Sequence, residues 1–557
     1  MAMISRLALA LALASLLALL WALPASATLA DETLASDDAV AAIESRSWAV
    51  DLPPRIDQRL PALALDPSQV SVYVRQVDAD RQYLAFNAEH PRIPASVAKL
   101  VTSIVALDIL GPRHRWHTEV LIDGRVSDHR LIGDLYIKGF GDPYLTVEAY
   151  AALIRAIRAK GIEQIAGNLV FDDSHLLPPE TGRGAFDGAA QSSYNALPAA
   201  LSVNRQITYV HIYNDRQHER VGVYTEPPLS ALEIVNEARI VNAPCKGRYH
   251  RLSVAYIEPE DGLPRLKIAG TFASECPEER IARLLLSPER HAAAAFDAMW
   301  RQFGGRIDGR VLLGSVPATA VPFHDAQSQP LGEIIRTINK SSDNLMARML
   351  FMELGVARDG PPGSVEKSRA VLADWLAERG FDLPGFYIDN GSGLSRDTRI
   401  SAAALGELLV WAYHQAWMPE LMASMPIMGV DGTLTKRMRH EPVAGRAHLK
   451  TGTVRDASCI AGYLLDAEGR RWVVVVLVNA IEGQRLQAWR GHAVHHDVLR
   501  WIYDGAVLPQ PQPETRPAKQ LAPDPTASSS LESHATDADP RRAFTNTEVI
   551  YENRDFI

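Results

Sequence analysis

Three short polar motifs, in a fixed order along the chain, constrain this protein more than any other feature of its sequence. They are Ser96-Val97-Ala98-Lys99, Ser342-Asp343-Asn344 and Lys450-Thr451-Gly452-Thr453. Ser342 follows Ser96 by 246 residues, which is longer than an ordinary loop can be.

The first motif combines a hydroxyl and an amine. Apolar residues recur at helical spacing from Ser96 to Leu110, so Ser96 and Lys99 are expected on one face of a helix start, where a neutral lysine can take the serine proton. With only ten lysines in the chain, chance supplies ~0.6 copies of this pattern. A second copy, Ser364-Val365-Glu366-Lys367, follows Pro361-Pro362-Gly363 and is interpreted as a helix N-cap.

The other two motifs differ in specificity. Taken alone, Ser342-Asp343-Asn344 is typical of an ordinary cluster at a helix N-terminus. The triplet at Lys450 is more specific, because chance would supply only ~0.02 copies. It lies in the stretch His448–Tyr463, which is expected as one strand. Gly452 beside Lys450 on a sheet edge would let a substrate backbone approach closely, and the alternative is a simple turn.

Together the motifs form the active-serine set of penicillin-binding proteins and β-lactamases. Further segments recur in register with them: Pro94–Leu100, Lys138–Pro143, Ala199–Asn204, Asp389–Arg396 and Gly429–Leu434. Over about residues 50 to 505 the chain resembles the class C low-molecular-mass penicillin-binding proteins, the D-alanyl-D-alanine carboxypeptidase/endopeptidase family. In that family the long gap between the first two motifs holds an inserted domain.

The resemblance implies five catalytic residues. Ser96 would attack the D-alanyl carbonyl with Lys99 as its general base, Ser342 would pass the proton to the departing amine, and Asn344 would bind the substrate amide. Lys450 would share the site with Lys99. Burial and like charge should then depress the pKa of one amine, which the mechanism requires.

The resemblance also implies the residues that bind the substrate: Thr451, Gly452, Thr453, Arg396 and Asp172. Lys450 and the two threonine hydroxyls would hold the terminal carboxylate, and the backbone N–H groups of Ser96 and Thr453 would form the oxyanion hole. Asp172, in the inserted region, could meet an amino group of the substrate. For Arg396 a structural salt bridge is the alternative.

The implied architecture is an α+β fold of the penicillin-binding-protein/β-lactamase-like transpeptidase type. It has an antiparallel sheet flanked by helices and a large inserted α/β domain. The expected ranges are a signal peptide over 1–27, the DD-peptidase domain over 28–111 and 319–507, the insertion over 112–318, and a disordered proline-rich tail over 508–557. Within the insertion, residues 161–169 and 305–311 resemble each other, which suggests paired helix–strand units of one domain.

The N-terminal residues indicate export. An apolar run from Leu7 to Leu23 follows Arg6 and precedes the small-residue stretch Pro24-Ala25-Ser26-Ala27. We therefore expect a cleaved signal peptide and a periplasmic protein, with an uncleaved anchor as the alternative.

Export permits disulfides, and the chain has three cysteines. Cys245 and Cys276 lie in the same region. A bridge closing that loop of about 30 residues would stabilise the fold by ~3–4 kcal/mol. The alternative is two buried free thiols, and Cys459 is expected to pack within a strand.

Charge and composition exclude other classes. The net charge of −9 disfavours nucleic-acid binding. His492, His495 and His496 have metal-like spacing but lie on a predicted exposed helix face, so neither a metal nor another cofactor is expected. The expected partners are peptidoglycan muropeptides and β-lactam antibiotics; a homodimer is an open alternative for the oligomeric state.

Two other functions remain alternatives. A β-lactamase of class A would carry a glutamate that activates water. No E-x-x-L-N string follows Asn344, which counts against that class. A non-catalytic cell-wall-binding or β-lactam-sensing protein could keep the same fold, but it would not need the full set of polar motif residues.

Overall fold

The computed structural model describes residues 51–79, 82–245 and 250–505. The expected signal peptide (1–27) and C-terminal tail (508–557) therefore lie outside the described residues. Within the described part of the chain, no helix is both long enough and apolar enough to cross a bilayer.

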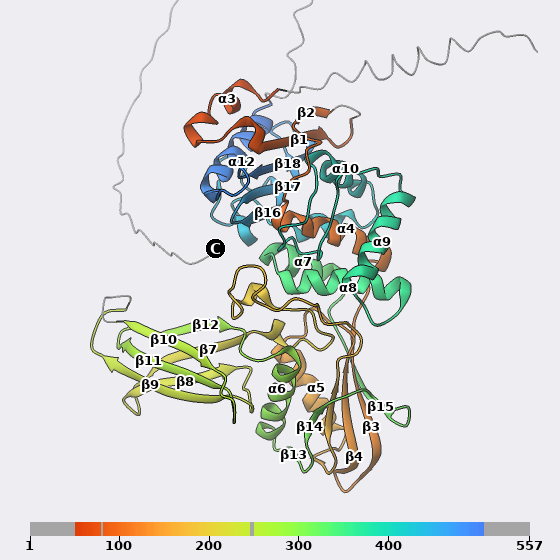
Figure 1. Cartoon of the computed structure of the whole chain (residues 1–557), viewed down its shortest axis with the longest axis vertical. Helices are drawn as coiled ribbons and strands as arrows, with labels where there is room; N and C mark the ends of the chain where they lie inside the picture. The colour runs from red at the N-terminus through yellow and green to blue at the C-terminus, as the bar shows by residue number, and fades with distance from the viewer. Residues whose placement is uncertain (1–50, 80–81, 246–249, 506–557) are drawn as a thin grey trace, which may run out of the picture. The chain divides into compact units, whose positions relative to one another are not determined.

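A five-stranded antiparallel sheet joins the two ends of the described chain (Figure 1). Its order is β16-β17-β18-β1-β2. The strands are β1 (Val70–Gln76), β2 (Gln82–Phe86), β16 (Ala447–Val454), β17 (Ala457–Leu465) and β18 (Arg471–Asn479). Because β1 pairs with β18, residues that are 400 positions apart in the sequence form neighbouring strands, as the two-segment domain requires.

The sheet is buried on both faces because its side chains alternate between two cores. On β18, Val474, Val476 and Val478 pack with Val494 and Val498 of the last helix. The intervening residues of the strand pack on the other face, against helices from the middle of the chain. This accounts for the uninterrupted β-branched run in β18, since a strand covered on both faces needs no polar positions.

Helices cover the two faces of the sheet. Those of this part of the chain are α3 (Pro54–Asp57), α4 (Ala98–Leu110), α7 (Leu331–Ser341), α8 (Asn344–Asp359), α9 (Val365–Glu378), α10 (Ala402–Tyr413), α11 (Met418–Ser424) and α12 (Ala488–Tyr503). The last helix, α12, packs on β17, whereas α10 packs on β18 and β1. Helix α4, which follows the first motif, packs against α8, which follows the second.

The segment between the two halves forms a mixed sheet and two three-stranded sheets. The strands are β3 (His117–Ser127), β4 (Arg130–Gly139), β5 (Gln164–Ile165), β6 (Leu169–Asp172), β7 (Thr208–Asp215), β8 (Arg220–Glu226), β9 (Glu233–Val241), β10 (Arg251–Ile257), β11 (Arg265–Ala273), β12 (Glu278–Arg283), β13 (Arg306–Ile307), β14 (Val311–Leu313) and β15 (Val321–Gln327). Its helices are α5 (Val147–Ala159) and α6 (Pro288–Gln302).

The internal resemblance predicted from the sequence is confirmed as a structural repeat. Helix α5 is followed by β5 and β6, and helix α6 by β13 and β14. The equivalent strands pair in parallel, β5 with β13 and β6 with β14. The two units therefore lie side by side in one sheet.

Two boundaries differ from the sequence expectation. The stretch from His448 to Tyr463, expected as one strand, forms the hairpin of β16 and β17, which turns at Arg455 and Asp456. Strand β15 pairs with β3, so the sheet of the inserted segment continues to Gln327, beyond the expected boundary at 318. In both places apolar residues continue past the point at which the chain changes the strand it pairs with. The periodicity of the sequence alone does not show such a change.

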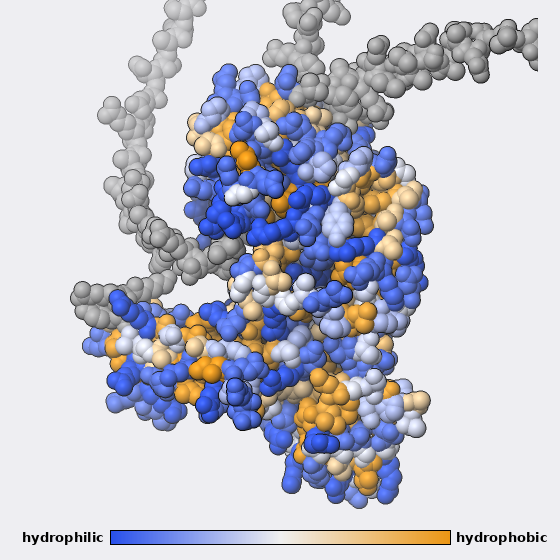
Figure 2. Space-filling view, viewed as in Figure 1, coloured by the Kyte–Doolittle hydropathy of each residue, from blue (hydrophilic) through white to orange (hydrophobic). Residues whose placement is uncertain are grey.

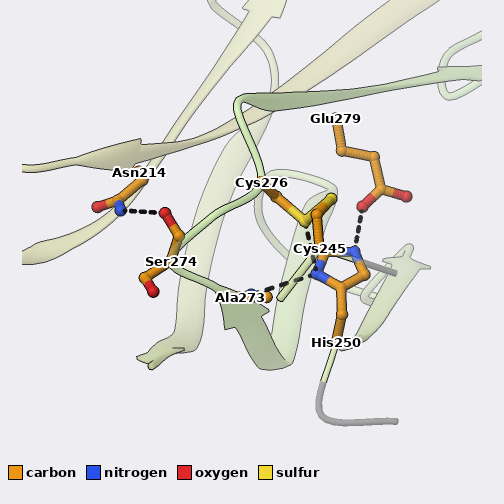
Figure 3. The surroundings of a disulfide bond; sticks show 7 residues. All are labelled: Asn214, Cys245, His250, Ala273, Ser274, Cys276 and Glu279. Carbon is orange, nitrogen blue, oxygen red and sulfur yellow. Dashed lines mark hydrogen bonds and ion pairs between the residues drawn. A yellow bond between two sulfur atoms is a disulfide. The ribbon is translucent and has the colours of Figure 1, made fainter. Parts of the chain in front are cut away.

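Cys245 and Cys276 form a disulfide bond, and Cys459 is a buried free thiol (Figure 3). His250 lies beside the bridge, where its Nδ1 accepts a hydrogen bond from the Ala273 backbone N–H at 3.2 Å. Its Nε2 lies 2.8 Å from a carboxylate oxygen of Glu279. The bridge thus ties the segment that follows β9 to the connection between β11 and β12.

Apolar surface is concentrated on the inserted segment. Figure 2 shows apolar side chains gathered over the region of β3, β4 and β14, whereas the surface around β16–β18 and α12 is mostly hydrophilic. Exposed apolar residues of this segment include Ile132, Val311, Leu313 and Val321.

Candidate active site

Ser96 and Lys99 lie at the entry to α4. Ser96 is in a single 3₁₀ turn, Ala95–Val97, and the α-helix begins at the next residue. The Lys99 Nζ atom is 3.0 Å from Ser96 Oγ. It is also 2.7 Å from Asn344 Oδ1 and 2.6 Å from the carbonyl oxygen of Ser392. The amine is fully buried and all three of its neighbours are uncharged.

This environment favours the neutral form of the amine. Burial and, next, the charge of Lys450 hold the pKa of Lys99 well below its ordinary value; Arg348 acts in the same direction and Asp343 opposes it. A neutral amine has two N–H donors and one lone pair. Two carbonyl-type oxygens take the two donors, which leaves the lone pair for the Ser96 hydroxyl proton.

Ser342 and Lys450 form a second hydroxyl–amine pair. Ser342 ends α7 in a left-handed conformation with φ of 60°, which aims its side chain away from the helix axis. Lys450 Nζ donates to Ser342 Oγ at 2.9 Å and to the Thr451 carbonyl oxygen at 2.7 Å. Burial lowers the pKa of Lys450 to about 7, so this amine can exchange a proton with the serine near neutral pH.

Two residues of the second motif have different contacts and different roles. Asp343 is the N-cap of α8 and accepts a hydrogen bond from the Met346 backbone N–H, so the N-cap interpretation of this cluster is correct for that residue. The amide of Asn344 instead faces Lys99. Its Nδ2 donates to the backbone carbonyl of Tyr194 at 3.1 Å, which connects the motif to the inserted segment.

Strand β16 presents the third motif at the edge of the sheet. Leu449 N donates to Pro426 O and Met428 N donates to Ala447 O. Odd-numbered residues therefore direct their backbone groups outward, and by the alternation of an antiparallel ladder Thr451 and Thr453 do the same. Both lie where a substrate backbone can pair with the free edge.

Gly452 is required by the protein itself. A Cβ at this position would lie 2.7 Å from Pro94 O and 2.8 Å from Ser96 N, closer than real contacts allow. The glycine therefore lets the strand approach the turn that carries the first motif, and not only a substrate, as the sequence had suggested.

Arg396 lines a pocket of about 570 Å³, which is also lined by Arg348 but by none of the motif residues. The pocket lies between residues 177–186 of the inserted segment and residues 389–397, which flank Ser392. The guanidinium is 3.4 Å from Asp456 in an ion pair and lies over the Phe186 ring. Arg396 thus has the salt bridge that was the alternative, and it also lines a pocket, so its contact with a substrate stays a prediction.

Asp172 lies at the end of β6, in the inserted segment. Its side chain is buried, and it accepts hydrogen bonds from the backbone N–H groups of Ser174 and Val316 at 2.9 Å. Lys138 is 3.9 Å away, and Asp172 does not line the pocket that Arg396 lines. These partners fix the orientation of the carboxylate, and its contact with a substrate amine stays a prediction.

Sequence reasoning gave no role to three groups that complete the site. They are the Ser392 carbonyl on Lys99, the Tyr194 carbonyl on Asn344, and Arg348, whose charge acts on Lys99. Ser392 lies within a segment already noted as similar to the family. The other two have no motif, because a backbone carbonyl and a single arginine leave no pattern in a sequence.

The three histidines of α12 surround an arginine. Arg437 donates to His496 Nε2 at 3.1 Å and lies 3.3 Å from His495 Nδ1. Burial first, and then the charge of Arg437, lower the pKa values of His492 and His496 to about 4. Neutral imidazoles that accept hydrogen bonds from a guanidinium account for the metal-like spacing, and no group of ligands suited to a metal ion occurs among the described residues.

This cluster predicts acid sensitivity. Between about pH 6.5 and pH 4 the unfolded chain protonates both histidines while the folded chain does not, so stability is lost as the pH falls through this window. Partial exposure reduces the effect to about 1–2 kcal/mol per histidine. In thermal unfolding from pH 7 to pH 4.5, His496→Gln should lose less stability than the native protein. Equal losses in both proteins would contradict the assignment.

Comparison with known proteins places this geometry in context. A model of the family described as D-Ala-D-Ala carboxypeptidase 3 (S13) matches residues 53–496. D-alanyl-D-alanine carboxypeptidase DacB of Haemophilus influenzae is 23% identical over 426 residues, covering 76% of this chain and 87% of that protein. D-alanyl-D-alanine carboxypeptidase of Actinomadura sp. strain R39 is 28% identical over 428 residues, covering 74% and 78%.

Solved structures show the same fold. The crystal structure of penicillin binding protein 4 (dacB) from Haemophilus influenzae superposes with a TM-score of 0.66 at 22% identity, covering 81% of this chain and 98% of that one. The same protein complexed with a β-lactam gives a TM-score of 0.63 at 21% identity. The expected penicillin-binding-protein fold, with its inserted region, is confirmed.

Proposed function

The chain belongs to the D-Ala-D-Ala carboxypeptidase 3 (S13) family of serine peptidases, and from this premise we propose how it works: it removes the terminal D-alanine of peptidoglycan stem peptides through an acyl-enzyme on Ser96. One observation carries the proposal. Two buried lysines stand beside two serines in one cluster, with Lys99 Nζ 3.0 Å from Ser96 Oγ and Lys450 Nζ 2.9 Å from Ser342 Oγ. Two amines of depressed pKa beside two hydroxyls form a proton relay.

Acylation begins with the Ser96 proton. The neutral Lys99 amine takes it while Ser96 Oγ bonds to the carbonyl carbon of the penultimate D-alanine. The charge that develops on the carbonyl oxygen meets the backbone N–H groups of Ser96 and Thr453. Gly452, next to Thr453, lies against the backbone of the Ser96 turn, which supports the pairing of these two donors. Each such donor contributes about 3–4 kcal/mol in other enzymes.

Expulsion of D-alanine needs a proton at its nitrogen. Ser342 Oγ supplies it and recovers one from Lys450, which lies 2.9 Å away. The C–N bond then breaks and the acyl group remains on Ser96 as an ester. Water then attacks this ester and gives one proton to Ser342, which passes a proton back to Lys450. Ser96 Oγ leaves and regains its proton from Lys99.

The proposal includes further substrates and a location. The pocket of about 570 Å³ that Arg396 lines offers room for the rest of the stem peptide. We therefore propose cleavage of D-alanyl cross-links as well as of free termini. Penicillin would acylate Ser96 in the same way, as supported by a relative of this fold solved in complex with a β-lactam. The N-terminal sequence supports export to the periplasm.

The test is release of D-alanine from a synthetic pentapeptide that ends in D-alanyl-D-alanine, measured beside hydrolysis of a penicillin. Turnover of the peptide, with slow turnover of the drug, is expected. Rapid drug hydrolysis without peptide turnover would instead identify a β-lactamase. Failure to act on either would identify a non-catalytic protein.

Ser364 provides a matched control for Ser96. It is the N-cap of α9, where its side chain accepts a hydrogen bond from the Lys367 backbone N–H at 3.2 Å. Ser364→Ala should lower the free energy of unfolding by about 1 kcal/mol and leave D-alanine release unchanged. Lost activity at unchanged thermal stability would overturn the choice of nucleophile.

A further inference from the structure

A loop with no assigned role touches the third motif. Residues 427–435 lead from α11 to β16 and contain a short 3₁₀ turn, Gly432–Leu434. At the tip, Thr433 Oγ1 lies 2.7 Å from Thr451 Oγ1. Thr433 is exposed and Thr451 is partly exposed, so both hydroxyls are open to a bound molecule.

The chain next to this loop also pairs with part of the outer edge of β16. Pro426 and Met428 occupy the outward-facing backbone groups of β16 as far as Leu449. Beyond Leu449, no strand of the described residues pairs with this edge, and the Thr451 carbonyl oxygen accepts a hydrogen bond from Lys450 Nζ. The Thr433 hydroxyl therefore stands at the point where protein pairing ends and substrate pairing can begin.

An ion pair anchors the loop to the second motif. Lys340 Nζ is 2.6 Å from Asp431 Oδ2, while Asp431 Oδ1 accepts a hydrogen bond from the Ile427 backbone N–H. Lys340 lies two residues before Ser342 in the same helix, α7. Gly432, with φ of 56°, fits closely over the Lys340 carbonyl, because a Cβ there would lie 2.8 Å from that oxygen. The position of Thr433 is thus fixed relative to Ser342.

We infer that Thr433 is a positioning residue for the terminal carboxylate of the substrate and acts through Thr451; this inference rests on the proposed function. A carboxylate only accepts hydrogen bonds, so a Thr451 hydroxyl that binds it must donate its single proton to it. The 2.7 Å contact then has one direction, with Thr433 donating to Thr451 Oγ1. Thr433 fixes the rotamer of that hydroxyl and, by donating to it, strengthens its bond to the anion.

The inference is tested with Thr433→Val, which removes the hydroxyl and keeps the shape. For a pentapeptide with a free terminal carboxylate, kcat/KM should fall about fivefold to tenfold, as for a lost hydrogen bond between two neutral groups, and the fall should come from a higher KM. For the same peptide with a terminal carboxamide, the variant should match the native protein within about twofold, because the charged acceptor is gone.

Two further variants separate positioning from general damage. Thr433→Ser should restore kcat/KM for the acid peptide. Thr435→Val removes a hydroxyl that donates to Gly432 O within the same loop and should change neither peptide. Equal losses on both peptides, no loss on the acid peptide, or no recovery with serine would overturn the inference. Absence of turnover by the native protein would instead reject the proposed function, so the two failures are distinguishable.

Discussion

Replacing Ser96 by alanine is expected to reduce D-alanine release by about 10,000-fold or more, because the acyl-enzyme cannot form without its hydroxyl. The side chain is partly exposed, and among the described residues its hydroxyl has one hydrogen-bond partner, Lys99. Its removal should therefore leave the thermal unfolding midpoint close to that of the native protein. The measurement is release of D-alanine from the pentapeptide by both proteins, with their unfolding curves.

Ser364→Ala is the control for this experiment, since that serine begins the other Ser-x-x-Lys sequence of the chain. The two variants should give opposite patterns: Ser96→Ala loses activity and keeps stability, while Ser364→Ala keeps activity and loses a little stability. Substantial D-alanine release by purified Ser96→Ala would contradict the assignment of the nucleophile.

Replacing Lys99 by methionine is expected to reduce kcat/KM by about 1,000-fold to 10,000-fold, the range of general-base catalysis. Methionine fills a similar volume but cannot accept a proton. It leaves Asn344 Oδ1 and Ser392 O without their donor, which destabilises the fold. It also removes the cost of burying an amine, which is stabilising. These effects oppose each other, so we expect a change of only a few degrees, about 2–4 °C, in the unfolding midpoint.

Lys367→Met is the matched control for Lys99→Met. Lys367 donates to the backbone carbonyls of Gly360 and Pro362 and has no contact with the motif serines in the described structure. Its substitution should leave kcat/KM within about twofold, the scale of a surface change. Retention of native activity by Lys99→Met would show that another group acts as the base.

The sequence allowed much of this site to be predicted because its parts lie in short motifs. Ser96 and Lys99 are three residues apart on one helical turn, so local geometry alone brings them together. The resemblance then supplied the partners from distant segments. The prediction that burial and like charge depress an amine pKa follows from elementary electrostatics, and in the structure burial is the largest cause for both lysines.

Other parts could not be predicted because they depend on tertiary contacts. The hairpin turn at Arg455 and Asp456 has neither glycine nor proline to indicate it, and apolar residues continue on both sides. The surroundings of Asp172 could not be predicted, because the backbone N–H group of Val316, which donates to its carboxylate, comes from a distant segment. Thr433 lies in a segment noted for its similarity, yet its role depends on a contact with β16.

The most direct test of the central claim is intact-mass spectrometry of the native protein over a time course with a penicillin, followed by peptide mapping. Opening of the β-lactam ring by the Ser96 hydroxyl expels no leaving group, so one adduct with the mass of the whole drug is predicted. It should persist, map to the peptide that contains Ser96, and be absent from Ser96→Ala. An adduct on any other residue, or no adduct at any time, would contradict the account.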